Sequence, residues 1–73
     1  MGLTVKAKEM IRFLESHGFW LKRTGKHHIM TNGIISFPVS KHPNEELSIG
    51  TMRSILYSAN LQKDELEIWL GRE

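Results

Sequence analysis

The residues of this chain best suited to chemistry follow a glycine in the run Gly25-Lys26-His27-His28. A histidine has an ordinary pKa of about 6.5, so it can take or give a proton at neutral pH. Neighbouring ammonium groups can hold a phosphate and favour the neutral imidazole, which is the form that acts as a base. His27 is therefore the candidate catalytic residue. The alternative is that the two histidines are only polar spacers in a strand.

Three strand-like runs surround His27. They lie between Phe19 and Val39 and are separated by Gly25-Lys26 and by Asn32-Gly33. Each break is two residues long and carries the glycine that a tight hairpin turn needs, so we predict a three-stranded antiparallel meander. In this meander His27 begins the central strand.

Tight turns at both breaks would fix which residues share a face, because directly opposed residues share a face and successive residues alternate. Counting outward pairs Leu21 with Met30, and Met30 with Ile35. The apolar face then holds Arg23 and His28 near one end, together with Phe19, Leu21, Met30, Ile35, Phe37 and Val39. The other face holds Trp20, Lys22, Thr24, His27, Ile29, Thr31, Ile34, Ser36 and Pro38. We expect the first face to be a core and the second to be open.

Helices are predicted on both sides of the meander. Apolar residues recur at helical spacing at Leu3, Ala7, Met10, Ile11 and Leu14, so we predict an amphipathic helix over residues 4–17 with Thr4 as the N-cap. Gly18 ends this helix and Phe19 closes a Schellman-type cap. A second helix covers residues 51–59, with Asn60 as a left-handed cap, and a short third helix covers residues 62–70.

Charged residues and an aromatic residue accompany His27. On the open face Lys22 and Lys26 would hold an RNA backbone, Trp20 would stack a base, and His27 would activate a 2′-hydroxyl. Lys41 and Arg53 are further candidates for phosphate contacts. The alternatives are that Lys41 lies in a solvated loop and that Arg53 makes a surface salt bridge.

A metal site is not expected. Adjacent His27 and His28 point to opposite faces, and no carboxylate or thiol stands at ligand spacing. We therefore predict no metal and no cofactor.

Composition sets the limits of the molecule. Residues 1–73 form one small domain with no cysteine and a net charge of +2. The apolar runs are far shorter than a membrane span and the start lacks a signal-peptide core, so a cytoplasmic protein is expected. Residues 1–44 carry seven Lys/Arg against two Glu, whereas residues 45–73 carry three basic and six acidic residues. This asymmetry suits a polyanion at one surface, although an ordinary solvated surface would look the same.

The predicted order, α-β-β-β-α plus a short helix, indicates an α+β two-layer sandwich, and it is the order of the double-stranded-RNA-binding domain. The motifs go further. Gly18-Phe19, Gly25-Lys26-His27-His28, Phe37-Pro38-Val39 and Gly50-Thr51-Met52-Arg53-Ser54-Ile55-Leu56 resemble the HicA (YcfA-like) toxin family over nearly the whole chain. Lys26 departs from the family's usual serine, and Ser40 stands where many members have histidine.

This resemblance implies a toxin of a type II toxin-antitoxin system that is an mRNA interferase. Such an enzyme is a metal-independent, sequence-tolerant endoribonuclease for single-stranded RNA, with His27 as its catalytic histidine. It further implies a monomer that a HicB-like antitoxin neutralises in a hetero-oligomer. Two alternatives are a non-catalytic RNA-binding module of the same fold and a protein-interaction module that has lost RNA binding.

Overall fold

The computed structural model describes residues 4–72, and Leu3, the first residue of the predicted apolar pattern, lies outside this range. The elements are α1 (Ala7–Glu15), β1 (Trp20–Thr24), β2 (His28–Thr31), β3 (Ser36–Val39), α2 (Ile49–Ala59) and α3 (Lys63–Arg72). The predicted order of one helix, three strands and two further helices is confirmed.

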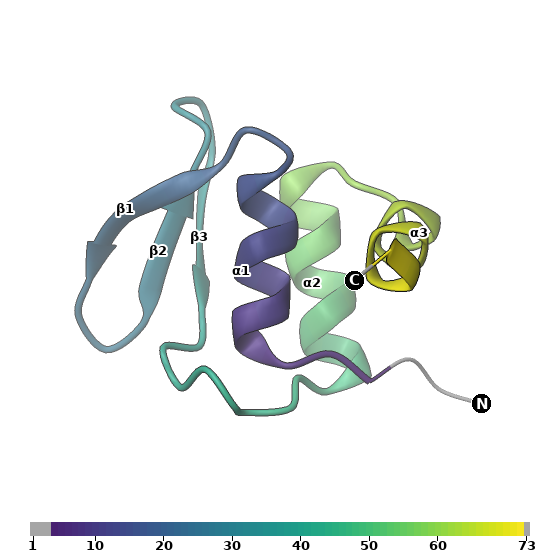
Figure 1. Ribbon diagram of the computed structural model, residues 1–73. Coiled ribbons are helices and arrows are strands. Elements are labelled where there is room, and N and C mark those ends of the chain that lie inside the picture. Colours follow the sequence, from purple (N-terminus) through teal and green to yellow (C-terminus); the bar gives the residue numbers. More distant parts are fainter. Residues whose placement is uncertain (1–3, 73) are drawn as a thin grey trace.

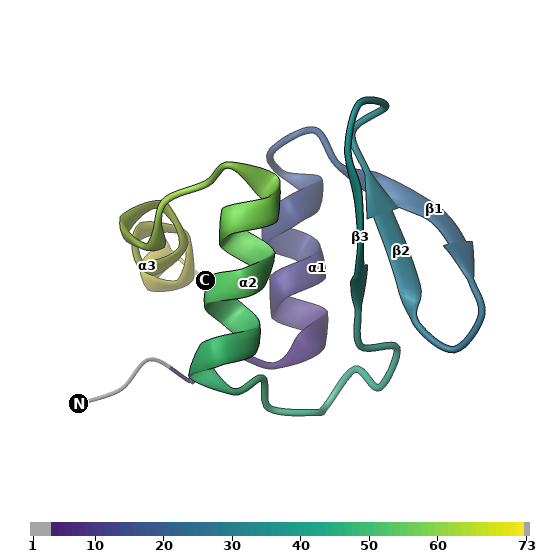
Figure 2. The same ribbon diagram turned by 180° about the vertical axis from the view of Figure 1, so that it is seen from behind.

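The three strands form one antiparallel sheet in the order β1-β2-β3. Helices α1 and α2 lie on one side of the sheet, and α3 lies beyond them, away from the strands (Figures 1 and 2). Within residues 4–72 the opposite sheet face carries no helix, and we call it the open face. The predicted α+β sandwich is confirmed.

The core lies between the helices and the two strands β2 and β3. Met10 and Phe13 of α1 and Met30 of β2 are fully buried, and Phe37 of β3 is nearly so. By contrast, all five residues of β1 are exposed, and Leu21, predicted in the core, is 46% exposed. The placement of Leu21 was wrong because β1, at the far edge of the twisted sheet, projects away from the helices (Figure 1).

Helix α1 begins later than predicted. The chain before it is extended, since Lys6 and Glu46 form an isolated antiparallel β-bridge through their backbones and the Leu47 N–H donates to the Val5 carbonyl. Lys6, not Thr4, is therefore the N-cap residue, and its N–H donates to the Glu9 carboxylate. The Schellman cap after α1 and the left-handed cap after α2 are confirmed, by the Phe19 N–H donating to the Leu14 carbonyl and by the φ of 58° at Asn60.

The loop between β2 and β3 has four residues, not the predicted two. The Asn32 Oδ1 accepts from the N–H groups of Ile34 and Ile35, and the Thr31 hydroxyl accepts from the Gly33 N–H. These side-chain bonds favour a wider turn over the tight one. Met30 consequently pairs with Phe37 instead of Ile35. A shift of two residues keeps every side chain of β3 on its predicted face.

Gly33 of this loop lies against the Trp20 indole. Its φ is +93°, and an added Cβ would lie 3.3 Å from the Trp20 Cη2 atom. We expect Gly33→Ala to lower the free energy of unfolding by about 1–2 kcal/mol, because an L residue is strained there and meets the indole. Gly50→Ala is the control, since an added Cβ in that turn of α2 meets nothing within 4 Å. Chemical denaturation should show Gly50→Ala unchanged or more stable; equal losses would contradict this account.

Candidate functional site

A bulge in β1 decides which side chains surround His27. Leu21 pairs with Met30 as predicted, but Arg23 pairs with Ile29, so the register shifts by one residue at Lys22. Beyond the bulge each residue of β1 therefore changes face. Arg23, predicted on the apolar face, shares the open face with Ile29.

His27 lies in the loop that follows. The loop has three residues, Gly25 to His27, because Thr24 pairs with His28. The prediction that His27 begins the central strand was therefore wrong by one residue. His27 is nevertheless exposed, and the Gly25 N–H donates to its carbonyl at 3.1 Å.

An open depression surrounds His27 at this end of the hairpin. We call it the hairpin depression; it is lined by Arg23, Thr24, Gly25, Lys26, His27 and Ile29. None of these six residues is acidic. The depression thus places an imidazole beside a guanidinium and an ammonium group, which can hold an anion against a group able to accept a proton. Sequence reasoning missed Arg23 here, since nothing in the local sequence marks the bulge.

His28 lies on the helix side of the sheet, as predicted. It is half-buried, it pairs with Val39, and its Nδ1 lies 3.0 Å from the Thr24 hydroxyl. Thr24 was predicted on the open face, and the bulge moves it to the side of His28. Part of the polar surface of this strand end is thereby satisfied within the hairpin.

Lys41 reaches the same loop from a distant part of the chain. Its Nζ donates to the Gly25 carbonyl at 2.9 Å. The segment that joins β3 to α2 and the loop that joins β1 to β2 lie at one end of the molecule (Figure 1). A cation from the β3–α2 segment therefore stands beside the hairpin depression.

Trp20 and Lys22 lie outside the lining of the depression. Trp20 is 51% exposed and pairs with Thr31, at the end of β1 opposite the loop. Thr24 is four steps along the strand from Trp20, and at about 3.3 Å a step the two residues are roughly 13 Å apart. Lys22 is exposed at the bulge. The indole and His27 share an exposed side of the hairpin but are not neighbours.

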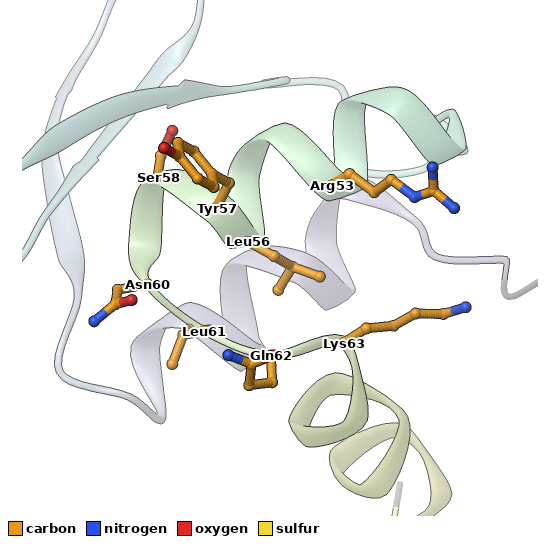
Figure 3. A pocket seen from close by; sticks show the side chains of 8 residues that line it. All are labelled: Arg53, Leu56, Tyr57, Ser58, Asn60, Leu61, Gln62 and Lys63. Atoms are coloured by element: carbon orange, nitrogen blue, oxygen red, sulfur yellow. The ribbon is translucent and has the colours of Figure 1, made fainter.

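Arg53 is not brought together with His27. It lies on α2 and lines a separate hollow against the start of α3, together with Leu56, Tyr57, Ser58, Asn60, Leu61, Gln62 and Lys63. Figure 3 shows the Arg53 and Lys63 side chains extending to the same side of this hollow. Helix α2 belongs to the layer behind the sheet, so Arg53 contributes nothing to the hairpin depression.

Two features are absent from residues 4–72. Among these residues, no three His, Asp or Glu side chains are grouped so that they could hold a metal ion. No helix in this range is long and apolar enough to cross a membrane.

The fold and the basic hairpin loop describe a small α+β domain with a solvent-accessible histidine. A family model described as the HicA toxin of bacterial toxin-antitoxin systems matches residues 7–61, and the chain therefore belongs to the HicA toxin family. This range contains every element of the fold except α3. No curated protein and no solved structure gave a significant match.

Proposed function

We propose that this HicA toxin is a metal-independent mRNA interferase whose catalytic residue is His27. The observation that carries the proposal is the hairpin depression, in which the exposed His27 stands with Arg23 and Lys26. Two cations can bind the oxygens of the scissile phosphate, and an accessible imidazole can accept a proton. A cytoplasmic location, where mRNA is found, is part of the proposal.

The proposed reaction uses the substrate's own 2′-hydroxyl. Neutral His27 accepts the 2′-hydroxyl proton, the 2′-oxygen bonds to phosphorus, and the bond from phosphorus to the 5′-oxygen breaks. The leaving 5′-oxygen takes a proton from water, and the imidazolium later returns its proton to solvent. The products are a cyclic phosphate and a free 5′-hydroxyl. Arg23 and Lys26 would stabilise the charge on phosphorus-bound oxygens.

Trp20 would bind the RNA strand at a point away from the scissile phosphate. Its half-exposed indole offers a stacking surface for an unpaired base. Because it lies at the other end of β1, the stacked base is not adjacent to the scissile phosphate. Stacking accepts any base, which fits sequence-tolerant cleavage.

The two histidines should respond oppositely to alanine. His27→Ala should lower the rate of RNA cleavage by about 10²–10⁴-fold, with the free energy of unfolding changed by less than about 0.5 kcal/mol, since the side chain is exposed. His28→Ala should cost about 1–2 kcal/mol, because it removes a half-buried ring and the hydrogen bond of that ring to Thr24, and should retain activity. Cleavage and thermal melts of both variants provide the test. RNA bound but uncut by the wild type would indicate the non-catalytic module instead.

The salt dependence of RNA binding should distinguish the cations of the hairpin depression from Arg53 on α2. Arg23→Gln and Lys26→Gln should each weaken RNA binding and flatten the plot of log affinity against log salt, by roughly one unit for each phosphate that the protein no longer neutralises. The measurement uses the His27→Ala protein, so that the RNA stays intact. Arg53→Gln is the matched control and should bind as before, because Arg53 lies on α2 away from the loop. An equal weakening with Arg53→Gln would move the RNA path to the helices.

A HicB-like antitoxin is the proposed partner. The exposed apolar residues Trp20 and Ile34 lie at one end of the sheet and the basic loop at the other. A domain with acidic groups near an apolar patch could cover both, replacing RNA phosphates by carboxylates. A hetero-oligomer of this kind would leave His27 without access to RNA.

The partner surface can be tested with two equally exposed residues. Ile34 and Tyr57 are both 89% exposed, the first in the β2–β3 loop and the second on α2. Ile34→Ser should raise the dissociation constant of the toxin-antitoxin complex several-fold, since serine cannot replace the apolar surface that isoleucine would bury there. Tyr57→Ser should leave it unchanged. Calorimetry of the purified pair decides, and a weakening confined to Tyr57→Ser would place the antitoxin on the helices.

A further inference from the structure

The loop that carries His27 receives little support from packing. It lies at the tip of a hairpin whose outer strand, β1, is exposed along its whole length. His27 itself is exposed, and the hairpin extends away from the helices (Figures 1 and 2). An exposed loop with few buried contacts samples many positions unless polar contacts hold it. Catalysis by a single histidine requires that this sampling be restricted.

Lys41 supplies such a contact. Its Nζ donates to the Gly25 carbonyl at 2.9 Å, and the Gly25 N–H donates to the His27 carbonyl at 3.1 Å. Two hydrogen bonds therefore lead from the Lys41 side chain to the backbone of His27. The first of them joins residues 16 positions apart, so it fixes the loop relative to another part of the fold.

The segment that carries Lys41 is itself held in place. The Ser40 hydroxyl donates to the Glu45 carboxylate and accepts from the His42 N–H. The carbonyls of Pro43 and Glu45 accept from the first N–H groups of α1, which have no partner within the helix. The segment thus rests on the beginning of a helix that supplies much of the core.

We propose that Lys41 is a positioning residue that holds the Gly25–His27 loop, and through it His27, against the β3–α2 segment. This inference rests on the proposed function only for its effect on catalysis; the anchoring of the loop stands independently. It gives Lys41 a role other than the phosphate contact expected from sequence. A phosphate contact would act on RNA affinity, whereas an anchor acts on the geometry of the step that follows binding.

Lys41→Met tests the anchor, because methionine keeps an unbranched apolar chain but has no donor and no charge. We expect the single-turnover cleavage rate at saturating RNA to fall between about tenfold and a hundredfold. RNA affinity and its salt dependence should change much less than on loss of a direct phosphate contact, and the melting temperature should shift by no more than a few degrees. Lys41→Arg, which keeps the donors, should restore most of the rate.

Lys26→Met is the matched control, since Lys26 is an exposed lysine within the Gly25–His27 loop and lines the hairpin depression. It should lower RNA affinity and flatten the salt dependence by roughly one unit. If Lys41→Met gives this second pattern, Lys41 is a phosphate contact and the anchor is wrong. If the wild type cleaves RNA and Lys41→Met changes neither the rate nor the affinity, the positioning role of Lys41 in catalysis is wrong.

A readout without RNA separates this inference from the proposed function. Amide ¹⁵N relaxation should show lower order parameters at Gly25 and His27 in Lys41→Met and unchanged values in Lys26→Met. Unchanged order parameters in Lys41→Met would overturn the anchor even in an active enzyme. Lower order parameters in a protein that never cleaves RNA would support the anchor and overturn the proposed interferase.

Discussion

The packing of β2 and β3 against α1 and α2 is the interaction on which the rest of the molecule depends. Met30 and Phe37 pair across these two strands and are buried with the apolar side chains of both helices. Residues 4–72 provide helices for one sheet face only, so the other face stays in contact with water. Strand β1 is then held mainly by its pairing with β2, with all of its residues exposed. The same one-sided core that stabilises the domain therefore leaves the basic hairpin accessible.

The two hairpins show which parts of a sheet can be predicted from sequence. In both, the glycine breaks located the turns, but each turn is longer than the predicted two residues. Asn32 and Thr31 bond to backbone groups and widen the second turn, which shifts the register by two and preserves the faces. The bulge at Lys22 shifts the first register by one and exchanges the faces of Arg23 and Thr24. A register shift of two residues leaves each side chain on its predicted face, whereas a shift of one residue moves it to the other face. No local sequence pattern indicates which shift will occur.

The site was predictable in part, for the same reason. His27 was predicted as the catalytic candidate from its chemistry and its place after a glycine turn, and its exposure does not depend on whether it begins a strand or ends a loop. Arg23 was missed because its face depends on the bulge. Trp20 and Arg53 were grouped with His27 by residue type, although one lies at the far end of β1 and the other on α2. Lys41 was a candidate for a phosphate contact, but its bond to Gly25 joins distant segments and so follows from the fold alone.

Accessibility and order make opposite demands on the proposed catalytic loop. An RNA strand can reach His27 because β1 and the loop lie outside the core, yet the same absence of packing leaves the loop without apolar support. Polar contacts can supply order without closing the site, since a hydrogen bond from a long side chain covers little of the loop surface. The Lys41 bond to the Gly25 carbonyl has this form, and it connects the loop to a segment that caps α1. In such a hairpin a hydrogen bond from a segment held at the start of α1 positions the histidine, while RNA can still reach it from solvent.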